Sequence, residues 1–179
     1  MYYAEIINFW FTELSPSQWW LKSAELDETI SRRFAAIHQR AIKGLLYQWR
    51  ATAEGALAEI LVLDQFSRNM YRDQPGAFAQ DILALVLAQE ALRRSLDQHV
   101  PVQQRHFFYL PFMHSEEALF QQESVHFFTG LGDAGALDFA EQHKVIIDRF
   151  GRFPHRNAIL GRNSTDEEEV FLQQPGSSF

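Results

Sequence analysis

With 179 residues, of which 46% are hydrophobic and 14% aromatic, the chain can bury one well-formed core and does not have the composition of a disordered protein. Its 16 basic and 23 acidic residues give a formal net charge of -7, which argues against a broad nucleic-acid-binding surface. Cysteine is absent, which excludes disulfides, thiolate metal sites and a cysteine nucleophile.

Helical periodicity runs through nearly the whole sequence, whereas sustained period-two alternation and Asn-Gly or Asp-Gly hairpin turns are missing. Pro111 limits one expected helix, and Ser164 with Glu167 has capping-box spacing at the start of the last one. We predict a single all-helical domain over residues 1–179 with seven or eight helices, built as an irregular bundle or as stacked antiparallel hairpins. The expected helices span residues 2–12, 25–43, 53–69, 77–97, 102–110, 115–129, 135–150 and 165–173.

The N-terminal segment bears on where the protein resides. It carries Glu5 and lacks the basic region of a signal peptide, so it reads as a short amphipathic helix. The longest apolar run in a helical context, around Ile82 to Ala88, is far shorter than the ~20 residues of a membrane span. We therefore expect a soluble cytoplasmic protein without a membrane or nucleic-acid partner.

Several polar residues fall on the apolar stripes of the expected helices. Glu116 and Glu123 lie one heptad, or about 10 Å, apart in the helix over 115–129. His143 lies near the middle of the stripe in the helix over 135–150. Because a buried carboxylate loses its hydration, Glu116 and Glu123 need cationic partners. A core histidine bonded to a backbone carbonyl is the alternative interpretation of His143.

Asp64 also points inward on the helical wheel, because it follows Leu57 by one heptad. Arg68 stands four residues after Asp64 and is placed for an ion pair within the same helix. Such a pair contributes little to stability when it is exposed. The two residues are therefore candidates either for a binding site or for a buried polar network that fixes how helices dock.

The segment from Arg149 to Arg162 concentrates four Arg and one His in an acidic chain. Gly151 is expected to end the preceding helix in a left-handed conformation, and Pro154 to hold Phe153 extended. Guanidinium and imidazole groups on such a backbone can converge on an anion. Equally, they can neutralise the protein's own carboxylates. The candidate ligand-binding residues are Asp64, Arg68, His114, Arg149, Arg152, His155, Arg156 and Asn157.

Catalysis is a second possibility, in which His143 acts as acid or base with Glu116 or Glu123. Glu123 and His126 have the Glu-x-x-His spacing of di-iron helices, but no second such motif is present. The sequence also lacks the phosphate-binding, dinucleotide-binding and nucleophile-elbow motifs. We therefore expect no metal and no cofactor.

Four sequence blocks occur together in a recognisable order. They are Ile-Asn-Phe-Trp-Phe at 7–11, Leu-Asp-Gln-Phe-Ser-Arg-Asn at 63–69, Tyr-Leu-Pro-Phe-Met-His-Ser-Glu at 109–116 and Arg-Phe-Gly-Arg-Phe-Pro-His-Arg-Asn at 149–157. The chain thereby resembles the bacterial domain-of-unknown-function family 924 over nearly its whole length. The resemblance implies a tetratricopeptide-like, right-handed stack of helical hairpins and no established activity, and it transfers no catalytic residue. Ser67 stands where proline is usual, which bears on how the helix over 53–69 ends.

Three functional hypotheses follow. The leading one is a binding module that holds a small anion or an acidic peptide in an Arg- and His-lined cleft. The second is a small-molecule enzyme that uses His143 with Glu116 or Glu123, with or without a metal. The third is a scaffold for a partner protein in which the polar residues serve only the fold.

Overall fold

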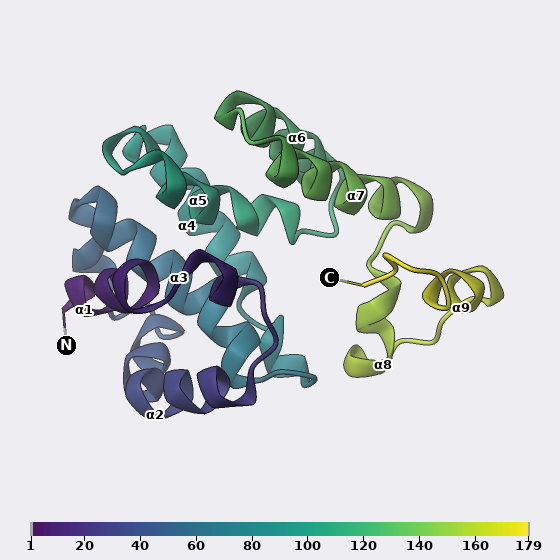
Figure 1. Ribbon diagram of the computed structural model, residues 1–179, viewed down its shortest axis with the longest axis horizontal. Coiled ribbons are helices and arrows are strands. Elements are labelled where there is room, and N and C mark those ends of the chain that lie inside the picture. The colour runs from purple at the N-terminus through teal and green to yellow at the C-terminus, as the bar shows by residue number, and fades with distance from the viewer. Residues whose placement is uncertain (1, 179) are drawn as a thin grey trace. The chain divides into compact units, whose positions relative to one another are not determined.

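Every regular element of residues 2–178, the part of the chain that the computed structural model describes, is helical (Figure 1). The prediction of an all-α fold is confirmed. The α-helices of these residues are α1 Tyr3–Asn8, α2 Ala24–Ala41, α3 Ala53–Met70, α4 Asp81–Arg93, α5 Val102–Met113, α6 Ala118–Leu131, α7 Ala134–Phe150, α8 Asn157–Leu160 and α9 Asp166–Leu172. Their number exceeds the expected seven or eight because the four-residue α8 is too short for the sequence to predict it.

Contacts divide the chain into two units. Unit 1 comprises Met1–Arg72 and Gly76–Pro111, and unit 2 comprises Asp73–Pro75 and Phe112–Phe179. Whether the two units fold as the single domain expected for residues 1–179 stays a prediction. Among residues 2–178 no helix has the length and apolarity needed to cross a membrane.

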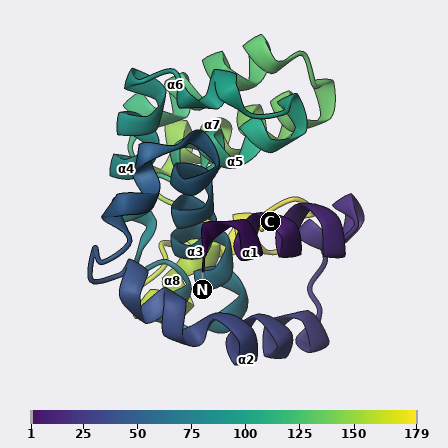
Figure 2. The same cartoon turned by 90° about the vertical axis from the view of Figure 1, so that its left-hand side faces the viewer.

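Unit 1 is built around α3, which contacts α1, α2 and α4 (Figure 2). Every residue of α3 from Gly55 to Ser67 is buried, as in a helix with protein on all sides. The aromatic rings of Phe34 and Phe66 stack with centroids 5.0 Å apart, and Phe9 lies 4.9 Å from Phe34. A side chain at Gly55 would meet the Trp49 carbonyl oxygen at 2.0 Å, so only glycine permits this close approach.

Several helix boundaries in unit 1 differ from the sequence prediction, whereas α3 matches it to within one residue. The helix expected over 2–12 is α-helical only as far as Asn8 and continues as a π-helix over Phe9–Glu13. The helix expected over 77–97 begins at Asp81 and ends at Arg93, because Ser95 takes a left-handed conformation with φ 56°. Pro111 lies inside α5, which continues to Met113. Ser67 does not end α3, since its hydroxyl donates to the Leu63 carbonyl one turn earlier, as a helical serine can.

Unit 2 begins with the hairpin of α6 and α7, which lie side by side (Figure 1). Asp133 caps α7 by accepting from the backbone N–H groups of Gly135 and Ala136. Gly151 ends α7 with φ 67°, and Phe153 is extended at φ -88° and ψ 107°, both as predicted.

Side-chain hydrogen bonds cap helix ends at the start of α9 and at the C-terminal end of α5. The last helix has its capping box at Thr165 and Glu168, one residue later than the predicted Ser164 and Glu167. The Gln121 side chain donates to the carbonyls of Met113 and Ser115 at 2.8 and 2.6 Å. These bonds satisfy acceptors that the C-terminal end of α5 leaves without helical partners.

Candidate functional site

The candidate residues fall in both units. Asp64 and Arg68 belong to unit 1. The remaining candidates belong to unit 2 and are His114, Glu116, Glu123, His143, Arg149, Arg152, His155, Arg156 and Asn157.

In unit 1, the predicted pair within α3 is present. Arg68 lies 3.0 Å from the Asp64 carboxylate and also forms two hydrogen bonds, of 2.9 and 3.1 Å, with Asp81 at the start of α4. Burial opposes ionisation of Arg68, but Asp64 and Asp81 outweigh it and raise the pKa of the guanidinium. One arginine between two carboxylates thus joins α3 to α4.

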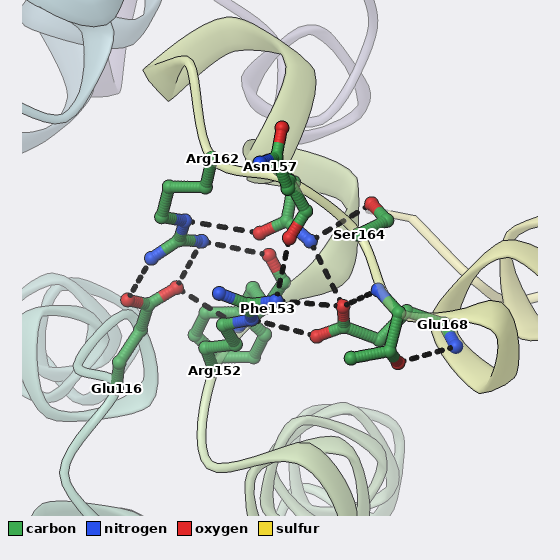
Figure 3. Close-up of polar contacts among 9 residues, drawn as sticks. Glu116, Arg152, Phe153, Asn157, Arg162, Ser164 and Glu168 are labelled. Atoms are coloured by element: carbon green, nitrogen blue, oxygen red, sulfur yellow. Dashed lines mark hydrogen bonds and ion pairs between the residues drawn. The ribbon is translucent and has the colours of Figure 1, made fainter.

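In unit 2, Glu116 forms a forked ion pair with Arg162 (Figure 3). The two hydrogen bonds measure 2.6 and 2.9 Å, and the Phe153 backbone N–H donates to the same carboxylate at 2.8 Å. Burial alone would raise the pKa of Glu116, yet the bonds from Arg162 and Phe153 and the nearby charges lower it. Glu116 is therefore an ionised, fully engaged carboxylate at neutral pH.

A second forked pair joins Arg152 to Glu168, with both hydrogen bonds at 2.7 Å. The bond from Arg152, then those from Thr165 and Asn157, lower the pKa of Glu168 to about 2. The Asn157 side chain connects the two pairs. Its Oδ1 accepts from Arg162, and its Nδ2 donates to Ser164 and Glu168 (Figure 3). The result is one continuous polar network, which we call the Glu116–Glu168 network.

Most arginines of the segment from Arg149 to Arg162 pair with the protein's own carboxylates. Arg152 and Arg162 bind the protein's own carboxylates, and Arg149 pairs with the exposed Glu167. Arg162 and Glu168 are not among the predicted site residues. The signal for Arg162 is its place at the end of the same arginine run, and the signal for Glu168 is its position three residues after a threonine.

Glu123 does not occupy the buried position that the helical wheel predicts. It is exposed on α6, whose buried residues are Gln121, Ser124 and Phe128. The helical wheel misplaces the buried face of α6 because the centre of that face consists of polar side chains. Leu119, which the wheel places on the buried face, is 61% exposed.

A second group of side chains surrounds the ring of Phe153, and we call it the His/Arg cluster. The His143 and His155 rings lie 5.5 and 5.6 Å from the Phe153 centroid, and the Arg156 guanidinium lies over the ring at 4.5 Å. His114 lies 6.3 Å from His143, and its carbonyl accepts a 3.0 Å bond from Arg156. The cluster therefore comprises His114, His143, His155 and Arg156.

The contacts of His143 define its protonation state. Its Nδ1 is 2.7 Å from the Phe139 carbonyl, and because a carbonyl only accepts, Nδ1 carries the proton. Burial is the main cause that lowers its pKa to about 3, and His114, Arg156 and His155 lower it further. His143 is consequently neutral at pH 7, with its lone pair on Nε2.

The structure thus brings together His114, His143, His155 and Arg156, and separately Glu116, Arg152 and Asn157 with Arg162 and Glu168. Within residues 2–178 no three His, Cys, Asp or Glu side chains are grouped as ligands for a metal ion.

Comparison with known proteins places the chain in a family. The model of a bacterial protein family of unknown function, DUF924, matches residues 6–176. A solved structure of a protein of unknown function from Agrobacterium tumefaciens is 42% identical, covers 96% of each chain and superimposes with a TM-score of 0.92. No curated protein matches. The chain therefore belongs to the bacterial DUF924 family.

Proposed function

We propose that this protein is a binding module that holds a small anion at the His/Arg cluster of unit 2. Two half-buried imidazoles, His114 and His155, accompany the Arg156 guanidinium around one aromatic ring. Imidazolium and guanidinium N–H groups are strong donors to carboxylate and phosphate oxygens. The observation that carries the proposal is geometric: His143, His155 and Arg156 all lie against the ring of Phe153, and His114 lies beside His143.

The backbone supports such a site by fixing its main cation. The bond of Arg156 to the His114 carbonyl and its position over Phe153 hold the guanidinium in one orientation. A guanidinium that is already ordered loses little conformational entropy when a ligand binds. The Glu116–Glu168 network contributes indirectly, because the Phe153 N–H and carbonyl bind Glu116 and Arg162. A cytoplasmic location and a tetratricopeptide-like stack are further parts of this proposal.

The acid–base alternative has less physical support. A general base works best when its pKa is near the working pH, whereas burial keeps the pKa of His143 at about 3. Glu116 is ionised by its pairing with Arg162, so it is not a proton donor at neutral pH. The scaffold alternative is supported for the Glu116–Glu168 network alone, whose bonds all serve the fold.

Anion-dependent thermal unfolding tests the proposal. Inorganic phosphate, compared with chloride at equal ionic strength, should raise the Tm of the wild-type protein, because a ligand that binds only the folded state stabilises it. The stabilisation would be about 2.7 kcal/mol at a ligand concentration 100 times the Kd. Arg156→Gln and His155→Asn should each abolish the increase.

Arg149→Gln is the matched control, because Arg149 is exposed and pairs with the exposed Glu167. It should leave the phosphate-dependent increase intact. An equal increase in wild type and in both cluster variants, or no increase in the wild type with phosphate or with carboxylate anions, would show that the cluster is not an anion site.

A further inference from the structure

The surface of unit 1 has a small hollow where the C-terminal end of α4 meets the first half of α3. Its volume is about 40 Å³, which is room for about three water-sized or methyl-sized groups. The apolar part of the lining comes from Ala56 of α3, Leu87 and Ala91 of α4, and Leu96. The hollow exists because Ala56 and Ala91 contribute only a methyl group where the two helices approach. The side of the hollow formed by these residues is therefore apolar.

Charged side chains also line the hollow, and most of their charge is already paired. Glu59 is fully buried and both of its oxygens accept from Arg50, at 2.6 and 2.8 Å. Glu90 likewise accepts two bonds from Arg93, at 2.7 and 2.8 Å. The two carboxylates are thus occupied by forked arginine pairs, which leaves them poorly disposed to bind a cation.

Arg94 is the exception. It follows α4, lines the hollow and donates from one nitrogen to the Arg50 carbonyl at 2.8 Å. Among residues 2–178 no ion pair joins Arg94 to a carboxylate, although its charge adds to the effect of Arg93 in lowering the pKa of Glu90. The bond to the Arg50 carbonyl orients the guanidinium at the hollow. The unmatched charge beside this apolar lining is therefore positive.

We infer that this hollow binds a short-chain aliphatic carboxylate, with the alkyl group against Ala56, Leu87 and Ala91 and the carboxylate on Arg94. The combination matches both halves of such a ligand. An inorganic anion would leave the apolar lining unused, and a neutral alkyl compound would leave Arg94 unused. The site lies in unit 1 and is independent of the His/Arg cluster.

A titration of the full chain with sodium propionate, followed by two-dimensional ¹H–¹⁵N NMR, tests the inference. Propionate should shift the backbone amides of Ala56, Leu87 and Ala91 with saturation, at a Kd on the order of millimolar, as expected for a ligand of five heavy atoms. Propionamide has the same shape without the charge and should bind at least tenfold more weakly.

Single substitutions show where on the protein propionate binds. Arg94→Gln should weaken propionate binding at least tenfold, whereas Arg40→Gln, at an exposed arginine of α2, should have no effect. Ala91→Val should block binding by filling the hollow, and Ala56→Val repeats this test on α3 if the first variant fails to fold. Arg156→Gln should leave these shifts unchanged, which distinguishes the hollow from the His/Arg cluster. Equal binding of propionamide, unchanged binding in Arg94→Gln, or no shift at the three amides would overturn the inference.

Discussion

Glu116 and Glu123 show what a helical wheel can predict about single residues. The wheel places both on one inward face, but α6 begins only at Ala118, so Glu116 precedes the helix and lies outside that periodicity. Glu116 is half-buried because Arg162 and the Phe153 N–H bind it, contacts that span 37 or more positions of sequence. The need for a cationic partner could be inferred from the sequence, but the identity of that partner could not.

For His143, in contrast, the helical wheel predicts burial correctly. The wheel predicts His143 on the buried face of its helix, and it is 6% exposed with Ala140, Ile146 and Ile147 also buried. A bond to a backbone carbonyl is the alternative interpretation of this residue, and the structure contains such a bond, to Phe139. His38 is buried as well, and burial lowers its pKa. Its Nε2 lies 2.8 Å from the Ser67 hydroxyl, a contact with no signal in the sequence.

The His143 imidazole should make stability depend on pH. Its folded pKa of about 3 lies below the ordinary 6.5, so between these values the unfolded chain binds a proton that the folded protein excludes. The free energy of unfolding should therefore fall as the pH falls below 6.5, with a contribution from His143 of at most about 1.4 kcal/mol per pH unit. His143→Asn removes this contribution. The difference in free energy of unfolding between the wild type and this variant, which we call the stability gap, should therefore narrow as the pH falls.

Urea unfolding at intervals between pH 7.5 and 5.0 measures this gap. His126→Asn provides the control, because His126 is exposed on α6, and its gap to the wild type should stay constant over the same range. A constant gap for His143→Asn would mean that the folded protein accommodates a protonated His143.

At the scale of elements, three long periodic helices were predicted closely, whereas the shortest helix was not predicted at all. The bounds of α2, α3 and α7 lie within two residues of those expected, because each carries a sustained helical pattern with clear end signals. The four-residue α8 lies in a segment too short to show a period. Pro111 gives a misleading end signal, since α5 continues past it and Gln121 caps the carbonyls beyond.

The start of α9 depends on one side chain. Thr165 accepts from the Glu168 N–H at 3.2 Å, and Glu168 accepts from the Thr165 N–H at 2.8 Å. Thr165→Ala should therefore lower the free energy of unfolding by about 1 kcal/mol, the usual cost of losing such a cap. Urea unfolding at pH 7 measures the loss.

Thr129→Ala is the comparison, because the Thr129 hydroxyl is exposed and bonds only to the Val125 carbonyl of its own helix. We expect a change within about 0.5 kcal/mol for this variant. Similar losses for the two threonines would show that the cap at Thr165 does not stabilise the unit.

At the scale of the whole molecule, the fold class followed from composition and periodicity, whereas the division into two units did not. That division is set by contacts distant in sequence, which a single sequence does not reveal. The net charge of -7 also constrains function, because an acidic protein repels anions at long range. An anion must therefore be held by short, oriented hydrogen bonds, which is the kind of interaction that the His/Arg cluster offers.

The most direct test of that site observes its own imidazoles. Long-range ¹H–¹⁵N NMR of the histidine rings, recorded during a titration with inorganic phosphate at constant ionic strength, should show saturable shifts of His114 and His155. These shifts should disappear in Arg156→Gln, while the exposed His99 and His126 should change little. Equal shifts of all four histidines, or no saturation at His114 and His155, would contradict the account.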